Sequence, residues 1–307
     1  MQIPESLQKK VSDIFGNRGD VWLKTAPALL QQAVEHWGLT EVTASPVMSH
    51  NFVCFAVSPQ YGKVALKLGV PHDELFREME TLRRYDGHLA CRMYDSDRNM
   101  AALLLERIVP GSNLWQITHR LARAEVVAGL LSALPVSARC VSGIPPHREV
   151  VARTFQRLRT RAEAHCELSE LMQAAEEAER SLYARNGEEL VLLHGDLNHW
   201  NILSGGNNQW RVIDPQGFVG PTALDAGRFM LNEMSYGESP CSESELPGLL
   251  TVMADSSGHP VLDLWQATLI DSVLSTCWHV EGGASPAKVT RQLQICQGIL
   301  RGEKVVQ

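Results

Sequence analysis

One ten-residue segment constrains this chain more than any other feature. It reads HGDLNHWNIL, from His194 to Leu203, and the dipeptide Ile213-Asp214 follows it. The apolar run Leu190–Leu193 before it predicts a buried strand that delivers His194 and Asp196 into a loop. A lone Asp or His is usually a turn, cap or packing residue, but this ordered set at this spacing is hard to obtain by accident. The segment therefore indicates an active-site loop.

A β-hairpin is predicted directly after this loop. Ile202–Ser204 and Gln209–Ile213 have strand character and flank Gly205–Asn208, which has the composition of a turn. Asn201 precedes the first strand and Asp214 follows the second, so we expect both at the open end of the hairpin. An amide oxygen beside a carboxylate offers the hard oxygen ligands that a phosphate-bound Mg²⁺ requires.

Asp196 lies five residues before Asn201. This spacing places its carboxylate where it can accept a proton from an attacking hydroxyl group. We expect His194 to orient the loop rather than to carry a proton. Asp225, at a predicted helix start, is expected to cap or brace the same loop. The pattern thus predicts Asp196 as the catalytic base.

A lysine and a glutamate upstream complete the expected phosphate site. Residues 63–67 read KVALK, and the period of two places Ala65 and Lys67 on one face of a strand. By itself Lys67 could equally be a solvated strand lysine. The following helix carries Glu78 within its apolar stripe, and a carboxylate there is costly unless it is paired. We predict an ion pair of Lys67 with Glu78, with Glu74 as the second choice.

Together these motifs resemble the aminoglycoside phosphotransferase family, whose members have a protein-kinase-like fold. The resemblance rests on H-G-D-L-x-x-x-N-I-L with the following I-D-P, the V-A-L-K strand, the Glu78 helix and the apolar run into Glu106. It spans roughly residues 16–285. Resemblance to the N-terminal extension of the streptomycin 6-kinase and hydroxyurea kinase branch lies in Gly19–Leu23, Pro27 and Trp37–Leu39.

The resemblance implies a role for each residue of this set. Asp196 would be the base, while Asn201 and Asp214 would bind Mg²⁺. Lys67 would hold the α- and β-phosphates of ATP, and Glu78 would orient Lys67. The expected cofactors are therefore ATP and Mg²⁺, with GTP as the alternative phosphoryl donor.

Further nucleotide contacts follow from the same resemblance, with two departures from the family pattern. The backbone from Glu106 to Ile108 would form the hinge that binds adenine. Ser49 and Asn51 would contact phosphate from the covering loop, although no G-x-G-x-x-G motif occurs there. Asp214–Gly217 replaces D-F-G, and no A-P-E segment follows. Without a long activation segment a protein substrate has little to dock on, which favours a small acceptor.

The predicted fold class is α+β, with a protein-kinase-like division into two lobes. Residues 1–41 are expected as a helical extension, 42–108 as a small β-rich nucleotide-binding lobe with one main helix, and 109–307 as a larger helical lobe with the catalytic loop and acceptor site. The main predicted strands are Phe52–Val57, Lys63–Leu68, Ala101–Glu106 and Val191–Leu193. The main predicted helices are Pro71–Tyr85, Leu114–Leu134 and Arg148–Arg185.

Composition narrows the class of protein. With 44% hydrophobic and 21% charged residues, the chain has the composition of an ordinary globular protein, and a net charge of −7 argues against nucleic-acid binding. No apolar run approaches the roughly 20 residues of a membrane span, and the N-terminus lacks the regions of a signal peptide. The seven cysteines are scattered and never spaced C-x-x-C, which favours reduced thiols. We expect a cytoplasmic protein that is not bound to membranes; its oligomeric state is not predicted.

The acceptor is addressed by one biased window. Residues 229–287 contain no Lys or Arg but eight acids. Such a window favours a cationic acceptor through its field, whereas the alternative is a solvated acidic surface. Candidate acceptor contacts within it are Glu233, Trp278 and Glu281.

The sequence therefore predicts an ATP- and Mg²⁺-dependent O-phosphotransferase that acts on a small cationic hydroxylated substrate. The resemblance favours an aminoglycoside such as streptomycin, with phosphorylation as a route to antibiotic resistance. The alternatives are hydroxyurea, which is neutral, or another small metabolite as the acceptor. A non-catalytic nucleotide-binding pseudokinase is the alternative from another class of function.

Overall fold

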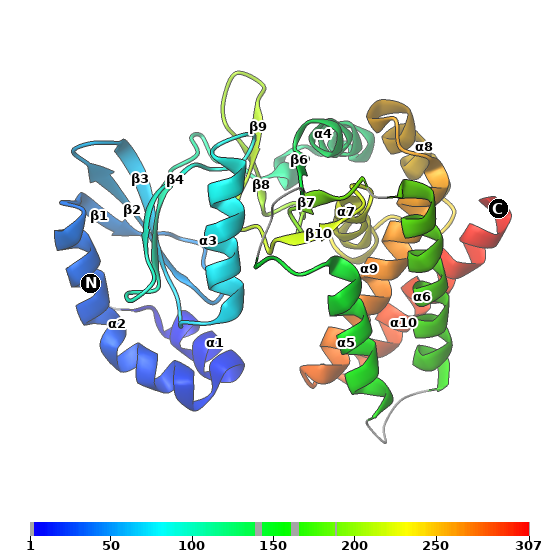
Figure 1. The fold of residues 1–307 in the computed structure, drawn as a ribbon, viewed down its shortest axis with the longest axis horizontal. Helices are drawn as coiled ribbons and strands as arrows, with labels where there is room; N and C mark the ends of the chain where they lie inside the picture. Colours follow the sequence, from blue (N-terminus) through cyan, green and yellow to red (C-terminus); the bar gives the residue numbers. More distant parts are fainter. Residues whose placement is uncertain (1–2, 139–142, 161–165, 188, 307) are drawn as a thin grey trace. The chain divides into compact units, whose positions relative to one another are not determined.

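The structure is a computed structural model that describes residues 3–138, 143–160, 166–187 and 189–306. The chain forms two compact units (Figure 1). Unit 1 contains the chain up to Gly111 together with the short segment Gly205–Asn207. Unit 2 contains Ser112–Ser204 and the chain from Asn208 onward.

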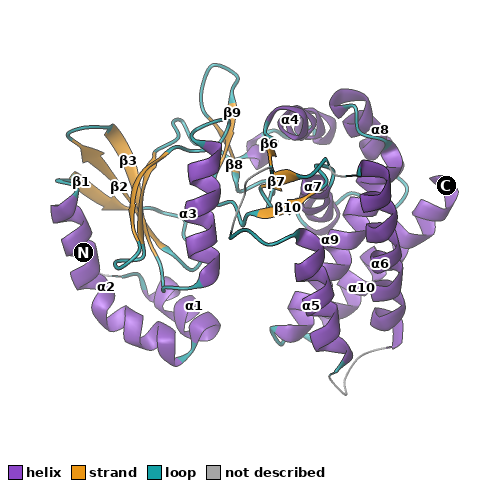
Figure 2. Ribbon diagram, in the orientation of Figure 1, coloured by secondary structure: helices purple, strands orange, loops and turns teal. Residues whose placement is uncertain are grey.

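Unit 1 contains a five-stranded antiparallel sheet with the strand order β1-β2-β3-β5-β4. Two helices precede the sheet in the chain, and a third connects β3 to β4 (Figure 2). The strands are β1 Thr40–Ala44, β2 Phe52–Ser58, β3 Gly62–Leu68, β4 Met93–Asp97 and β5 Ala102–Glu106. The helices are α1 Glu5–Phe15, α2 Asn17–His36 and α3 Asp73–Tyr85.

The period of two explains how this sheet presents two different faces. Phe52, Cys54 and Ala56 of β2 are buried and alternate with half-buried residues. They belong to one hydrophobic core with the buried side chains of α1 and α2, such as Leu7 and Trp22. The helical segment at the start of the chain therefore shares a core with the sheet.

Unit 2 is mainly helical and is built around one buried helix. Every residue of α9 from Asp263 to Cys277 is buried, and α6, α7 and α10 pack against it. The helices of the unit are α4 Arg120–Ala133, α5 His147–Arg159, α6 Cys166–Asn186, α7 Leu224–Ser235, α8 Leu246–Ser257, α9 Val261–Glu281 and α10 Pro286–Val306. No helix in the described ranges has the length and apolar character needed to cross a membrane.

Two small β elements in unit 2 hold the predicted loop. β7 (Val191–Leu193) is the middle strand of a three-stranded sheet with β6 (Val136–Ser137) and β10 (Phe218–Gly220). β8 (Ile202–Ser204) and β9 (Trp210–Val212) form an antiparallel hairpin. The loop from His194 to Asn201 connects β7 to this hairpin.

The sequence-based assignment of elements was good where the pattern was strong and failed at sheet edges. The strands β2, β3, β5, β7 and the hairpin lie where they were predicted. β1 and β4 were missed because both are edge strands without apolar alternation; β1 is largely exposed and β4 is mostly half-buried. The predicted helix Leu114–Leu134 begins only at Arg120, after a 3₁₀ turn at Leu114–Gln116. The predicted helix Arg148–Arg185 is two helices, and residues 161–165 between them lie outside the described residues.

Candidate active site

Two backbone hydrogen bonds hold the start of the loop that follows β7. The carboxylate of Asp225, in the first turn of α7, accepts from the backbone N–H of His194 at 2.8 Å and of Gly195 at 2.7 Å. Burial raises the pKa of Asp225 to about 6, and these two N–H donors oppose the rise. The structure confirms the expectation that Asp225 braces the loop.

Gly195 lets the chain turn at this point. Its φ of +78° lies in the left-handed region that favours glycine. A Cβ atom added there would lie 2.5 Å from the ring of Phe218. Only glycine therefore fits between the brace of Asp225 and the side chain of β10.

His194 links the loop to the end of the hairpin. Its Nε2 lies 2.9 Å from the carbonyl oxygen of Ile213, and its Nδ1 accepts from the backbone N–H of Asp196 at 3.2 Å. Burial lowers the pKa of His194 to about 4, against the opposing hydrogen bond to Ile213. A neutral ring with its proton on Nε2 satisfies both contacts, so His194 orients the loop as expected.

The two oxygens of the Asp196 carboxylate have different surroundings. Oδ2 accepts from Asn198 Nδ2 and from Asn201 Nδ2, each at 2.9 Å. Oδ1 lies 3.5 Å from Nε of Arg228, and 24% of the side chain is exposed. Burial raises the pKa of Asp196 to about 6, while the charge of Arg228 and the hydrogen bond from Asn198 oppose the rise. Oδ2 thus accepts two amide donors, whereas Oδ1 accepts no hydrogen bond from the described residues.

The hairpin register brings Asn201 and Asp214 to the same end. Ile202 pairs with Val212, and the N–H of Ile213 donates to the carbonyl oxygen of Asn201 at 2.9 Å. Asn201 Nδ2 also donates to the backbone oxygen of Asp196 at 3.0 Å, which fixes the orientation of the amide. The amide oxygen Oδ1 is therefore the atom that Asn201 can offer to a cation. This oxygen and the Asp214 carboxylate form a hard donor set that fits Mg²⁺ together with phosphate oxygens.

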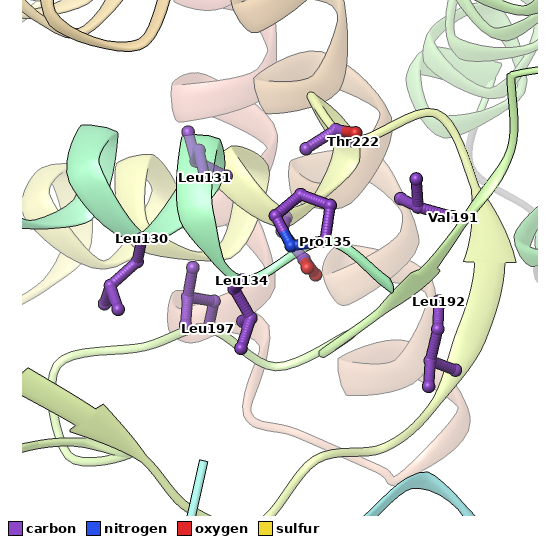
Figure 3. Close-up of a pocket in the computed structure, with 9 residues that line it drawn as sticks. Leu130, Leu131, Leu134, Pro135, Val191, Leu192, Leu197 and Thr222 are labelled. Carbon is purple, nitrogen blue, oxygen red and sulfur yellow. The ribbon is translucent and has the colours of Figure 1, made fainter. Parts of the chain in front are cut away.

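An apolar cavity lies behind the loop (Figure 3). Leu197 of the loop, Leu130 of α4 and Leu134, which directly follows α4, line it together with Leu192 of β7. Its volume of about 10 Å³ has room for at most about one water molecule. The cavity is therefore a small packing gap beneath the loop and is too small for a substrate.

In unit 1 the predicted ion pair between Lys67 and Glu78 is present. Lys67 Nζ donates to both carboxylate oxygens of Glu78, at 2.8 and 2.7 Å. The two side chains are only 4% and 7% exposed. A buried lysine that is paired in this way is held in one place, which suits it to a fixed phosphate group.

The other residues predicted to contact the nucleotide differ in their exposure and in their hydrogen bonds. Ser49 is exposed in the connection between β1 and β2, but Asn51 is 5% exposed, and its Oδ1 packs against Gly69. Asn51 is therefore a buried residue, and its contact with phosphate stays a prediction. The N–H of Glu106 already donates to the carbonyl oxygen of Arg92 at 2.7 Å. This N–H of the predicted hinge is therefore not available to the adenine base. Ile108 lies in the loop that follows β5.

A family model described as aminoglycoside/hydroxyurea antibiotic resistance kinase matches residues 36–283. The chain belongs to this family. The match covers both units, including the Lys67–Glu78 pair and the loop around Asp196.

Individual relatives agree with the family. A streptomycin 6-kinase of Streptomyces glaucescens is 27% identical over 227 residues, which is 73% of either chain. A hydroxyurea phosphotransferase of Kitasatospora aureofaciens is 29% identical over 291 residues, 92% of this chain and 82% of that protein. The crystal structure of aminoglycoside phosphotransferase APH(4)-Ia superposes with a TM-score of 0.63 at 13% identity, covering 90% of this chain and 99% of that one. The predicted protein-kinase-like fold is thereby confirmed.

Glu233 has a place that differs from the prediction. It is 1% exposed, and Arg123 binds both of its oxygens, at 2.6 and 2.8 Å. His199 Nε2 lies 2.7 Å from the same carboxylate, and its ring stacks between Trp115 and Phe229. A carboxylate bound from three sides in the core does not face an acceptor, so Glu233 is corrected to a buried anchor of the loop.

The acidic window is largely neutralised by arginines from outside it. Glu281, the second predicted acceptor contact, pairs with Arg157 at 2.8 Å. Glu238 and Asp255 make no ion pair within the described ranges of the chain. The other ion pairs of the window are Glu233 with Arg123 and Arg120, Glu243 with Arg301, Glu245 with Arg120, Asp263 with Arg185, and Asp271 with Arg228. The absence of basic residues in the window thus does not produce an unpaired acidic field.

Trp278, the third predicted acceptor contact, is half-buried, and the guanidinium group of Arg228 lies 5.7 Å from its ring centre. Arg228 itself, like Asn198, contacts Asp196 but was not predicted. A signal for Arg228 was available: it is the last basic residue before the window that lacks them, and it lies one turn after Asp225. Trp278 remains a candidate acceptor contact, because its neighbour Arg228 lies beside Asp196.

Proposed function

We propose that the protein transfers the γ-phosphoryl group of ATP to a hydroxyl group of a small acceptor, with Asp196 as the base. The observation that carries the proposal is the asymmetric carboxylate of Asp196. Its Oδ2 is fixed by two amide donors, while Oδ1 accepts no hydrogen bond from the described residues and 24% of the side chain is exposed. A fixed carboxylate with one accessible oxygen is what an acceptor hydroxyl requires.

The proposed step moves one phosphoryl group and one proton. The acceptor oxygen forms a bond to the γ-phosphorus as the bond between that phosphorus and the β,γ-bridging oxygen breaks. The proton of the acceptor hydroxyl passes to Oδ1 of Asp196, and ADP leaves with the bridging oxygen. Because the transition state is loose, alignment and charge neutralisation contribute more than the basicity of Asp196.

The remaining residues serve the nucleotide. Lys67, held by Glu78, would bind the α- and β-phosphates. Asn201 Oδ1 and the carboxylate of Asp214 would hold Mg²⁺. When bound, Mg²⁺ would neutralise phosphate charge. The hinge at Glu106–Ile108 would bind the base through the groups that the sheet leaves available.

We propose an aminoglycoside such as streptomycin as the first acceptor to test, because the family and a 27% identical streptomycin 6-kinase support it. Hydroxyurea is the second candidate. Two observations favour it: the hydroxyurea phosphotransferase matches 92% of this chain, and most acids of the window are already paired with arginines. A neutral acceptor needs no unpaired acidic field.

A substrate panel with a base-deficient variant tests the proposal. Streptomycin, hydroxyurea and choline are incubated with ATP and Mg²⁺, and ADP release and the phosphorylated product are measured. Asp196→Ala should lower turnover by about 10²–10⁴ while ATP binding is kept. Asp255→Ala, which removes an exposed acid of α8, is the matched control and should keep the parent rate. An Asp196→Ala protein that turns over at the parent rate refutes the base, and silence of the parent on every acceptor favours a pseudokinase.

A further inference from the structure

Arg228 lies beside the Asp196 carboxylate and has no part in the step described above. Its Nε lies 3.5 Å from Asp196 Oδ1, and its Nη2 donates to Asp271 Oδ1 at 3.1 Å. The guanidinium group also lies over the ring of Trp278 at 5.7 Å. With only 16% of its side chain exposed, Arg228 is held from three sides within unit 2.

The close approach of α7 and α9 puts Arg228 in this position. A Cβ atom added at Gly227 would lie 2.5 Å from the carbonyl oxygen of Ala267 and 2.7 Å from Cβ of Asp271. A residue without a side chain is therefore required where the two helices cross. The next residue, Arg228, then reaches Asp271 on one side and the catalytic loop on the other.

Two atoms of this cluster lack hydrogen-bond partners. Nε of Arg228 and Oδ2 of Asp271 are buried, and neither has a partner within the part of the chain that the structure describes. A buried donor without a partner is energetically unfavourable. Hydrogen bonds in catalytic sites are often long without substrate and shorten when it binds. A shift of roughly half an ångström would turn the 3.5 Å contact of Nε with Asp196 into a charge-assisted hydrogen bond.

The hydrogen-bonding capacity of Asp196 then determines which position remains. A carboxylate offers about four lone-pair positions, two on each oxygen. Asn198 and Asn201 use two of them at Oδ2. We propose that Arg228, held by Asp271, is a positioning residue for the base: its Nε–H occupies one position on Oδ1 and leaves the other for the acceptor hydroxyl.

This inference rests on the proposed role of Asp196 as the base. A direct contact of Arg228 with the acceptor is less consistent with the structure, because its guanidinium group is tied to Asp196 and Asp271 and largely buried. It also carries a positive charge, which repels a cationic acceptor. Arg228 therefore acts through Asp196, and its loss should affect kcat rather than the KM of either substrate.

The test compares arginine variants of the full chain in steady-state kinetics with ATP, Mg²⁺ and streptomycin, or hydroxyurea where that is the acceptor phosphorylated. Arg228→Ala should lower kcat by about 10–100-fold, with both KM values within about twofold of the parent. Added methylguanidinium should restore part of the lost kcat. Arg228→Lys should lose about tenfold, because it keeps the charge but not the planar fork of donors. Arg185→Ala is the matched control, since Arg185 also pairs with an acid of α9, Asp263, and should keep the parent kcat.

Three results would overturn the proposal. The first is an unchanged kcat for Arg228→Ala. The second is a rise in the acceptor KM with kcat preserved, which would make Arg228 a binding residue. The third is a loss that methylguanidinium does not restore and that Arg185→Ala shares, which would mark a general packing role. If Arg228→Ala does not fold, Arg228→Lys carries the test, and an unchanged kcat in it refutes the proposal. Asp196→Ala is measured alongside. Parent-like turnover in that variant would refute the proposed role of Asp196 as the base, which is a separate outcome from the test of Arg228.

Discussion

Replacing Glu233 by glutamine tests whether this residue anchors the core or contacts the acceptor. Its carboxylate is 1% exposed and is bound by Arg123 through both oxygens and by His199. Burial opposes the charge of Glu233, but the hydrogen bonds from Arg123 and His199 outweigh it and lower the pKa from 4.5 to about 2. At about 1.4 kcal/mol per pH unit, this difference corresponds to about 3 kcal/mol. Removal of one partner from a buried ion pair costs about 3–5 kcal/mol, which is of the same size.

The expected loss depends on pH in a defined direction. The pKa of Glu233 is lower in the folded than in the unfolded chain, so its stabilisation is complete above about pH 4.5 and disappears as the pH falls towards 2. Glu233→Gln should therefore lose about 3 kcal/mol of unfolding free energy at pH 7. The difference from the parent should shrink by about 2 kcal/mol at pH 3.

Urea denaturation at pH 7 and pH 3, followed by circular dichroism, measures both values. Glu238→Gln is the matched control, because Glu238 is exposed and has no ion pair in the described residues, and it should change stability by less than about 0.5 kcal/mol. A Glu233→Gln loss below about 1 kcal/mol at pH 7, or one that does not depend on pH, would refute the reasoning. A raised acceptor KM without a loss of stability would restore Glu233 as an acceptor contact.

Four further substitutions test other parts of the structure. Lys67→Ala should lower kcat/KM for ATP by about 10²–10³, and Glu78→Gln by about tenfold, because a buried phosphate ligand is lost or left unpaired; parent-like kinetics would contradict the role of the pair. Asp225→Ala removes two charge-assisted hydrogen bonds to the loop and should cost about 3 kcal/mol in a denaturation experiment, together with most of the turnover; a stable, active variant would show that the loop does not depend on this brace. Gly227→Ala should destabilise the protein by about 1–3 kcal/mol through its clash with α9, whereas Gly248→Ala, which meets open space on α8, should not; equal melting temperatures of the two variants would rule out the close approach.

Local patterns predicted the parts of the site that lie close together in the chain. The hairpin after Asn201 was predictable because two short strand runs flank a turn of glycine and asparagine, and antiparallel pairing then brings Asp214 back to Asn201. The pair of Lys67 and Glu78 was predictable because a carboxylate in an apolar helix stripe needs a partner and β3 offers one.

Contacts between distant segments escaped the same reasoning. Arg123 and Glu233 are 110 residues apart, and Arg157 and Glu281 are 124 residues apart. A count of charges within one window cannot detect the ion-pair partners that the fold brings to it from other segments of the chain. The interpretation of the acidic window did not anticipate its arginine partners for this reason, and a cationic acceptor stays a prediction.

The sequence alone determined the identity, order and spacing of the residues in the loop around Asp196. The pattern of these residues along the chain was enough to indicate the family, and the match to the family model confirmed it. Only the tertiary structure decided which group lies beside Oδ1 of Asp196, because Arg228 comes from α7 and its partner Asp271 from α9. The physical reason is that spacing along the chain determines local geometry, whereas the direction of a side chain in a core depends on how helices pack.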